Sequence, residues 1–292
     1  MRVEVVHKVP KLQTLLRDDG ERVERLQSRA PDVYRGLHDA AERQQRSLES
    51  VVEAFSRHGH DVSTTAQDLF ERVSDGVQVV VVVGGDGTVL DVAHSVESQP
   101  ILAINSDPDR SVGYFCAVEA QHAETAARRV ANDEVVRTRL HRIQLHINGE
   151  PYGIPCLNDI LIANAHPAMM SRYVLSTGLL SEKQSSSGLW ISTPAGSTGG
   201  IRSAGGTVLP LSGAMLQYLV REPYMPRGTG YRMSRGVRHL SEGLTVRSLM
   251  TGGRIYVDGP YHEIAFEIGD VMTLSEGPGL TLLDVHAELR GR

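Results

Sequence analysis

The feature that most constrains the fold is a run of valines that leads directly into a glycine-rich turn. Residues 77–83 are nearly all valine, and the next five residues, 84–88, read Gly-Gly-Asp-Gly-Thr. A short stretch that is apolar on both faces is typical of a central parallel strand with helices covering each side. Apolar spacing predicts a helix from Val89 to Val96, and residues 100–104 predict the next strand. Strand, turn, helix and strand form a βαβ unit, which predicts an open α/β domain.

The first 73 residues predict further elements of this domain. Val3 to Val6 is a short apolar run suited to a buried strand, and Asp61 to Thr65 is a second candidate strand. Between them, residues 11–57 are rich in Arg and Glu, with apolar residues at three- and four-residue spacing. This spacing predicts one or two amphipathic helices. Ala66 to Val73 is expected to form a short helix.

The pattern changes after Arg139, where short apolar runs alternate with turn residues. Short strands separated by such turns describe a mostly β domain. The expected strands are residues 141–147, 160–163, 172–176, 189–192, 244–248, 254–257 and 264–268. We therefore expect an α/β domain with an open parallel sheet over residues 1–138 and a mostly β domain over residues 139–275. A C-terminal segment, residues 276–292, is expected to return to the first domain.

Composition excludes several classes of protein. The 30 Lys and Arg residues against 35 Asp and Glu give a formal net charge of −5. This balance provides no field that would concentrate the chain on nucleic acid or on an anionic membrane, so we expect neither partner. The two cysteines, Cys116 and Cys156, are expected to be thiols in a reducing compartment. The charged first residues and the lack of a long apolar run predict a cytoplasmic protein.

The turn at residues 84–88 has the composition of a phosphate-binding loop. Glycines let phosphate oxygens approach main-chain N–H groups without a Cβ in the way, and the following helix offers its positive N-terminus to the same anion. Asp86 does not suit a pure phosphate cradle, because a carboxylate repels phosphate. It suits a hydroxyl group that is about to be phosphorylated. The alternative is an ordinary strand-to-helix turn in which Asp is tolerated.

Two further segments carry polar groups suited to a nucleoside. Residues 192–200, Ser-Thr-Pro-Ala-Gly-Ser-Thr-Gly-Gly, and the Ser-Ala-Gly-Gly at residues 203–206 offer hydroxyls and exposed main chain to a ribose or a phosphate. A flexible Ser/Gly hairpin is the alternative. Asn-Asp at residues 158–159 precedes an apolar strand, and an amide beside a carboxylate is able to bind adjacent sugar hydroxyls. An Asx turn is the alternative there.

In this order the three motifs resemble those of the NAD kinase family, which transfers phosphate from ATP to the 2′-hydroxyl of the adenosine ribose in NAD or NADH. The family's Gly-Gly-Asp-Gly-Thr matches residues 84–88 at every position. Its Asn-Glu pair matches residues 158–159, with Asp in place of Glu. Its Thr-Pro-Thr-Gly-Ser-Thr matches residues 193–198, with Ala195 in place of Thr.

Further segments extend the resemblance over most of the chain. The family's Leu-Gly-Phe matches Val-Gly-Tyr at residues 112–114, and its late Asp-Gly matches residues 258–259. The similarity runs from about Val77 to Asp270. It implies an NAD kinase-like fold, ATP as the phosphoryl donor, Mg²⁺ brought with ATP, and assembly as a homodimer or homotetramer.

The resemblance also implies a role for each site residue. Asp86 is the expected catalytic residue, accepting the proton of the ribose hydroxyl. The expected phosphate and ATP contacts are Gly84, Gly85, Gly87 and Thr88. The expected NAD(H) contacts are Tyr114, Asn158, Asp159, Thr198, Gly199 and Ser203. No resident metal site is expected.

Departures from the family pattern leave the choice between NAD and NADH open. Ser187-Gly188 replaces the usual Asp-Gly, which removes a charged contact near the substrate. Gly199-Gly200 replaces the usual Ala-Tyr, which removes an aromatic side chain from the loop. The connection at residues 105–110 is longer than usual, and here the chain resembles the divergent plant-type NADH kinases.

Two other functions stay open. One is a kinase of another hydroxyl acceptor, such as a diacylglycerol-like lipid, which the acidic sequence with 5% aromatic residues does not favour. The other is a dinucleotide-binding sensor without catalysis, which the substitutions at Ser187 and Gly200 favour and the intact Asp86 opposes. The sequence contains no Walker-type motif and no HExxH or Cys/His zinc pattern.

Overall fold

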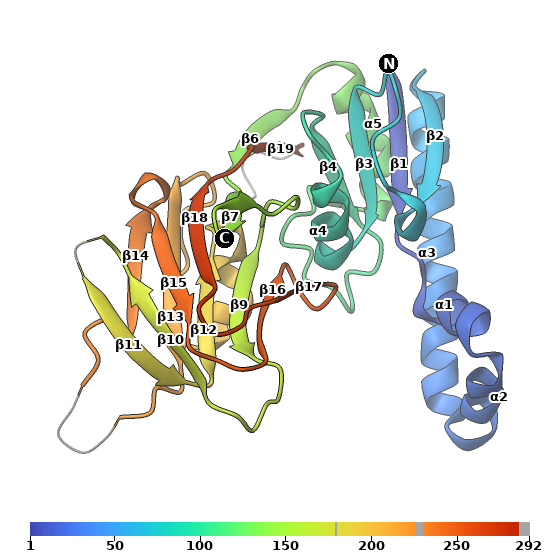
Figure 1. The fold of residues 1–292 in the computed structure, drawn as a ribbon. Helices are drawn as coiled ribbons and strands as arrows, with labels where there is room; N and C mark the ends of the chain where they lie inside the picture. The colour runs from blue at the N-terminus through green and yellow to red at the C-terminus, as the bar shows by residue number, and fades with distance from the viewer. Residues whose placement is uncertain (179, 226–229, 286–292) are drawn as a thin grey trace. The chain divides into compact units, whose positions relative to one another are not determined.

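The computed structural model describes residues 1–178, 180–225 and 230–285, and Figure 1 shows the fold as a ribbon. The chain divides into two compact units. Residues 1–138 and the segment that begins at Leu280 form the first, and Arg139–Gly279 form the second. Residues 286–292, the end of the predicted C-terminal segment, lie outside the described residues. Across the described ranges, no helix is both long and apolar enough to cross a membrane.

The first unit is built on a mainly parallel sheet. Its strands are β1 (Arg2–His7), β2 (Asp61–Ala66), β3 (Val79–Gly84), β4 (Ile101–Asn105), β5 (Val118–Glu119), β6 (Val136–Leu140) and β19 (Leu280–Asp284). They follow the order β2-β1-β3-β4-β19-β6, and β5 pairs with β4 outside this path. Strands β1 to β4 pair in parallel, as does β19 with β4. Every residue of β3 is buried, which agrees with the prediction of a central strand covered on both faces.

The first unit also contains helices and short 3₁₀ turns. They are α1 (Lys11–Asp18), α2 (Gly20–Arg29), α3 (Pro31–Arg57), α4 (Asp86–His94), α5 (Ala123–Ala131) and the short 3₁₀ turns η1 (Gln67–Leu69) and η2 (Ala120–His122). One hydrophobic cluster joins α3 and α5 to alternate residues of β1, β3 and β4, so these two helices share one face of the sheet. The long helix α3 runs beside the strands in Figure 1.

Two helix predictions for the first unit need correction. Residues 11–57 form three helices rather than one or two, because the backbone leaves helical geometry at Asp19 and at Ala30. The Asp19 side chain caps α2 by accepting the N–H of Arg22, and Pro31 stands at the start of α3. The helix expected over residues 66–73 is wrong, since only the 3₁₀ turn η1 forms there. The 3₁₀ turn does not continue into a helix, because the backbone at Phe70 is extended and the Phe70 ring is buried.

The second unit is mostly β. One antiparallel sheet has the order β11-β10-β15-β18-β7-β8, and the other has the order β14-β13-β12-β9-β16-β17. In the first sheet the bounds are β7 (Ile143–Ile147), β8 (Glu150–Pro151), β10 (Ser171–Ser176), β11 (Ser181–Ser186), β15 (Leu244–Ser248) and β18 (Val271–Glu276). In the second they are β9 (Asp159–Asn164), β12 (Gly188–Ser192), β13 (Met215–Arg221), β14 (Arg235–His239), β16 (Gly253–Val257) and β17 (His262–Ala265). The short helical segments are η3 (Ala195–Thr198), α6 (Gly200–Ser203) and η4 (Leu240–Glu242).

One hydrophobic cluster contains residues of both sheets in the second unit, so the sheets pack face to face. The strand predicted over residues 264–268 was placed too late, because β17 begins at His262 and ends at Ala265. Its antiparallel pairing with β16, in which Val257 lies opposite His262, decides that position.

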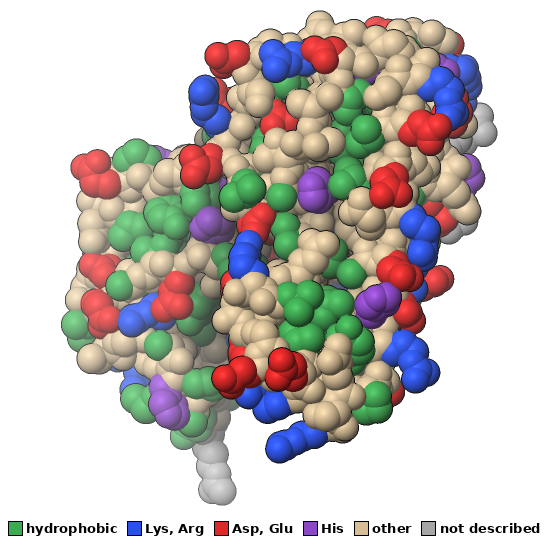
Figure 2. Space-filling model, turned by 90° about the vertical axis from the view of Figure 1, so that its right-hand side faces the viewer, with side chains coloured by type: hydrophobic (Ala, Val, Ile, Leu, Met, Phe, Trp, Pro, Cys, Tyr) green, Lys and Arg blue, Asp and Glu red, His purple; other side chains and the backbone are tan. Residues whose placement is uncertain are grey.

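Both cysteines are thiols outside any disulfide, as expected from the sequence. Cys156 is fully buried, and burial together with the charge of Asp258 raises the pKa of its thiol well above the ordinary value. Acidic and basic side chains alternate over the face of the molecule that Figure 2 shows.

Candidate functional site

The predicted phosphate loop lies at the carboxyl end of β3. Strand β3 ends at Gly84, Gly85 caps the following helix, and Asp86 is the first residue of α4. A Cβ on Gly84 would lie 2.5 Å from Thr88 Oγ1, and one on Gly85 would lie 2.4 Å from Ser111 Oγ. A Cβ on Gly84 would also lie 2.8 Å from Thr88 Cβ, so this position favours glycine, whereas a Cβ on Gly85 would require the Ser111 hydroxyl to move.

The first turn of α4 has backbone N–H groups without an acceptor inside the helix. The N–H groups of Thr88 and Val89 both donate to Gly85 O, at 3.0 and 3.2 Å. The N–H groups of Asp86 and Gly87 come earlier and have no partner within the helix. They add to the positive end of the helix dipole. Gly87 is exposed, and a Cβ there would meet nothing within 4 Å.

The Asp86 carboxylate is held by one oxygen only. Its Oδ1 accepts the N–H of Phe115 at 2.9 Å. Its Oδ2 makes no hydrogen bond to any residue that the structure describes. Phe115 follows Tyr114, and the two rings contact edge to face with centroids 5.5 Å apart. One backbone hydrogen bond therefore brings the predicted catalytic acid and the predicted base-covering ring into the same part of the first unit.

The loop that carries Tyr114 has a defined internal structure. Asn105 donates from Nδ2 to Ser111 O at 3.0 Å and accepts the N–H of Asp107 at 3.1 Å. Gly113 has a φ of +64°, and a Cβ there would lie 2.5 Å from Asn105 Nδ2. This position therefore needs glycine for its backbone and for its packing.

Helix α3 donates hydrogen bonds to the backbone at the end of β3 and at the start of the loop that carries Tyr114. Gln44 donates to Val83 O at 3.0 Å, and Ser47 donates to Ser106 O at 3.1 Å. A cavity of about 620 Å³ opens beside this loop, with Asn105, Ser111, Gly113, Cys116, Glu119 and His122 among its lining residues. Helix α3 thus anchors the carboxyl ends of β3 and β4.

In the second unit, the carboxylate of Asp258 organises the chain around the Asn158-Asp159 motif. Its oxygens accept three consecutive backbone N–H groups, those of Leu157 at 2.8 Å, Asn158 at 2.7 Å and Asp159 at 3.0 Å. Asp258 has a φ of +51° and is only 8% exposed. The buried Arg142 guanidinium also interacts with this carboxylate, whose charge opposes the lowering of the Arg142 pKa by burial. Sequence reasoning noted the Asp-Gly match at this position but did not assign Asp258 to the site.

Asp159 is a buried acid with a perturbed pKa. Burial raises the pKa of its carboxyl to about 7, and the nearby charge of Asp258 adds to the effect. Asn158 Nδ2 donates to Asp159 Oδ2 at 3.2 Å, so the two motif side chains contact one another. Asp159 also lines a cavity of about 260 Å³ in this unit. A carboxyl group that titrates near neutral pH at a cavity wall is a candidate ligand contact.

The Thr-Pro-Ala-Gly-Ser-Thr loop packs directly on the Asn158-Asp159 motif. The N–H of Thr193 donates to Asn158 O at 3.1 Å. A Cβ on Gly196 would lie 1.9 Å from the same oxygen, and one on Gly199 would lie 3.6 Å from the Asn158 side chain. The structure therefore brings Asn158, Asp159 and Gly199 together.

The other two predicted dinucleotide contacts of this loop are more peripheral. Thr198 ends η3 and is half-buried, and Ser203 ends α6 and is exposed. The structure places both on the loop but gives neither a hydrogen bond to the Asn158-Asp159 motif.

Alanine at two loop glycines is expected to have opposite consequences. Gly196→Ala should destabilise the fold by about 3 kcal/mol, because its methyl group meets a main-chain oxygen that cannot move freely. Gly87→Ala should leave stability unchanged or raise it by up to about 1 kcal/mol, because the position is open and helical. Denaturant unfolding measures both. A stable Gly196→Ala protein would contradict the packing of this loop on Asn158.

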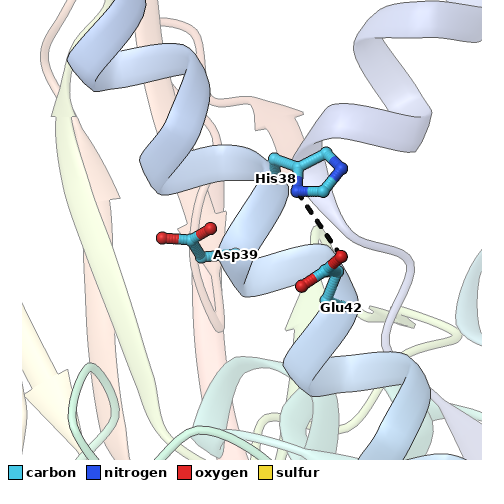
Figure 3. Close-up of side chains that lie close together, drawn as sticks. All are labelled: His38, Asp39 and Glu42. Carbon is cyan, nitrogen blue, oxygen red and sulfur yellow. Dashed lines mark ion pairs between the residues drawn. The ribbon is translucent and has the colours of Figure 1, made fainter.

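Outside these motifs, a cluster of one histidine and two acidic side chains has the composition of a metal site. His38, Asp39 and Glu42 have potential ligand atoms within 4.8 Å of one another on α3. Figure 3 shows Asp39 directed away from the His38–Glu42 pair, whose Nδ1 and Oε1 atoms are 3.8 Å apart. His38 and Glu42 are exposed, so we assign the group to the solvated face of the helix.

Comparisons with known proteins agree with this geometry. The family model described as ATP-NAD kinase N-terminal domain matches residues 15–135. A probable NADH kinase of Oryza sativa subsp. japonica is 31% identical over 268 residues, which cover 84% of this chain and 82% of the relative. The NADH kinase of Arabidopsis thaliana is 34% identical over 251 residues, covering 77% of this chain and 78% of the relative. These plant relatives confirm the resemblance noted from the motifs.

Solved structures share the fold. An NAD kinase from Archaeoglobus fulgidus in complex with ATP superposes with a TM-score of 0.66 at 20% identity, covering 99% of this chain and 94% of the other. Yeast NADH kinase complexed with NADH superposes with a TM-score of 0.69 at 15% identity, covering 99% and 84%. The predicted α/β unit with a parallel sheet and the mostly β unit are thereby confirmed. From the extent of the plant similarity and from this fold, the chain belongs to the NAD kinase family.

Proposed function

We propose that this chain transfers the terminal phosphoryl group of ATP to the 2′-hydroxyl of the adenosine ribose of NAD or NADH, giving NADP or NADPH. The observation that carries the proposal is the position of Asp86. A carboxylate stands at the N-terminus of a helix that begins with a glycine turn, with one oxygen held by the Phe115 N–H and the other unengaged among the described residues.

The phosphates of ATP are assigned to the β3–α4 turn. Gly84 and Gly85 keep the turn free of side chains, and the N–H groups of Asp86 and Gly87 have no acceptor within the helix. The hydroxyl of Thr88 lies against Gly84, next to the same turn. Main-chain donors of this kind hold phosphate oxygens and favour the charge that develops during transfer.

Asp86 is assigned the role of proton acceptor. A ribose hydroxyl is a weak nucleophile at neutral pH, and a carboxylate within hydrogen-bond reach orients it and accepts its proton as the new bond to phosphorus forms. The bond from the transferred phosphorus to the bridging oxygen of ADP breaks in the same step. Because the transition state is loose, most of the acceleration comes from alignment and charge neutralisation.

The acceptor dinucleotide is assigned to residues of the second unit. Asn158 and Asp159 are proposed to bind ribose hydroxyls, the amide as donor or acceptor and the carboxylate as acceptor. Thr198, Gly199 and Ser203 are proposed to line the adenine and ribose positions, and Tyr114 is proposed to cover a base.

Mg²⁺ would be held at the phosphate turn mainly by the substrate phosphates that bring it. The one unengaged oxygen of Asp86 is assigned to the ribose hydroxyl and is not needed as a ligand. When bound with ATP, the ion would neutralise charge on the phosphates. We also propose a cytoplasmic enzyme that assembles as a homodimer or homotetramer, which light scattering of the purified protein would test.

Three measurements together separate the candidate functions. The protein is mixed with ATP, Mg²⁺ and either NAD or NADH, and the nucleotides are separated by chromatography. NADP or NADPH is expected, and the ratio of the two rates gives the acceptor preference. Phosphorylation of diacylglycerol vesicles without NADP(H) would instead indicate a lipid kinase. Binding of NAD by calorimetry with no phosphorylated product would indicate a sensor.

A further inference from the structure

Trp190, the single tryptophan of the chain, lies on the outer face of a sheet in the second unit. Its neighbours in sequence, Leu189 and Ile191, belong to the hydrophobic core, so alternation along the strand turns Trp190 to the opposite face. Trp190 lies opposite Leu161 of β9, and Leu161 lies opposite Tyr256 of β16. Three adjacent strands therefore place two aromatic rings on either side of one leucine.

These three side chains form the walls of a small cavity. The cavity of about 260 Å³ is lined by Asp159, Leu161, Trp190, Tyr256, Gly259 and Pro260, all from the second unit. It is smaller than the pockets of roughly 300–1,000 Å³ that enclose drug-sized ligands. Its size suits one base with part of its sugar rather than a whole dinucleotide. The one carboxyl group among these lining side chains is that of Asp159.

The loop that departs from the family pattern contacts the same indole. A Cβ on Gly200 would lie 3.2 Å from Trp190 Cζ2 and 3.3 Å from Cη2. An aromatic side chain at position 200, which the resemblance leads one to expect, would occupy the space next to this ring. Glycine at position 200 and tryptophan at position 190 are thus structurally linked.

We propose that Trp190 and Tyr256 bind the flat base of the dinucleotide acceptor, with Asp159 accepting a hydroxyl of the attached ribose. The proposal rests on the proposed function, because it deepens the acceptor site that Asp159 belongs to. Trp190 is then an acceptor-binding residue that supplies from a strand the aromatic surface that Gly200 removes from the loop. Base stacking on an aromatic side chain tolerates any base, since each has a π-face.

Arg221 adds charge beside the cavity between Trp190 and Tyr256, which we call the slot. Its guanidinium carbon lies 5.7 Å from the Trp190 ring centroid, within the range of a cation–π contact. Arg221 comes from β13, which pairs with β12 on the side away from β9. The cation therefore borders Trp190 on the side opposite Leu161 and leaves the slot itself to the base.

The single tryptophan makes the proposal directly measurable, because all tryptophan fluorescence of this 292-residue chain reports on position 190. Titration with NAD is expected to change this fluorescence saturably. ADP-ribose and nicotinamide mononucleotide identify which half of the acceptor enters the slot, and a response to either supports the proposal. A response to ATP alone, or no response to NAD at concentrations that saturate the enzyme, would overturn it.

Kinetics of variants supply a second and independent test. Trp190→Leu is expected to raise the KM for the acceptor about 5- to 100-fold with the KM for ATP nearly unchanged, whereas Trp190→Phe keeps a ring and stays within a few-fold of the native value. Tyr256→Leu should act in the same direction as Trp190→Leu. Tyr261→Leu is the matched control, because Tyr261 is 82% exposed and lies in the turn between β16 and β17, outside the cavity lining.

The two levels of the proposal fail in different ways. If NADP(H) forms but Trp190→Leu leaves the acceptor KM and its ratio to the KM for ATP unchanged, the proposal that the slot binds the acceptor base is contradicted. The proposed kinase function is then unaffected. If no NADP(H) forms with the native protein, the proposed function is wrong, and the fluorescence titration with NAD still decides whether the slot binds a dinucleotide. Melting temperatures of all variants exclude loss of fold as the cause.

Discussion

Asp86→Asn is expected to lower kcat for NADP(H) formation by about 10²- to 10⁴-fold while leaving the Kd for NAD and the melting temperature nearly unchanged. The amide keeps the shape of the side chain, and its oxygen still accepts the N–H of Phe115, so the Tyr114 loop keeps its anchor. It cannot accept a proton from the ribose hydroxyl. Initial rates with saturating ATP and NAD, together with calorimetric binding of NAD, measure both quantities.

Two further variants control this result. Asp91→Asn makes the same change of charge on the same helix, away from the glycine turn, and should retain activity. Asp86→Ala also removes the acceptor for the Phe115 N–H, so it should lose stability in addition to turnover. Equal losses of NAD binding and turnover in Asp86→Asn would make Asp86 a structural residue of the turn.

Asp159→Asn is expected to stabilise the folded protein above pH 7 by up to about 4 kcal/mol and to weaken acceptor binding. The folded-state pKa of about 7 lies above the ordinary value of 3.8. The folded state therefore binds this proton more tightly than the unfolded state does. That contribution to stability is fully present below about pH 4 and is lost as pH rises through 7. A neutral amide avoids the cost of a buried charge, so the gain should be large at pH 8 and small at pH 4.

The same substitution should raise the KM for the acceptor about 5- to 100-fold, the scale of a polar contact of about 1–3 kcal/mol. For the native enzyme, acceptor affinity should rise as pH increases through 7, because the ionised carboxylate is the better acceptor for a ribose hydroxyl. Urea unfolding at pH 5 and pH 8 measures the stability term. Asp75→Asn is the control, since its side chain is 95% exposed and its change should stay within about 0.5 kcal/mol at both pH values. Destabilisation of equal size at both pH values would show that the hydrogen bond from Asn158 outweighs burial.

Much of the first unit followed from local sequence. The valine run of β3, the glycine turn and the apolar face of α4 are each contiguous, and each pattern is strong enough to predict its element without knowledge of its neighbours. The breaks between α1, α2 and α3 were missed because the apolar spacing continues through them. A side-chain cap at Asp19 and the backbone at Ala30 decide those ends.

The contiguous motifs of the candidate site could be recognised in the sequence, but contacts between distant segments could not. Asn158 and Asp159 stand together in the sequence, but the carboxylate that holds their backbone comes from Asp258, about 100 residues later. The pKa of Asp159 is raised because its carboxyl is buried in the folded second unit and because the charge of Asp258 is nearby. Neither is visible in a local pattern.

The sequence alone determined the α/β and β division of the chain, the glycine turn with Asp86, and the family resemblance, because these depend on residues adjacent in the chain. Tertiary structure alone decided that Trp190, Leu161 and Tyr256 meet across three strands and that Gly200 leaves room for the indole. The physical reason is that strand register, not sequence distance, decides which side chains share one face of a sheet.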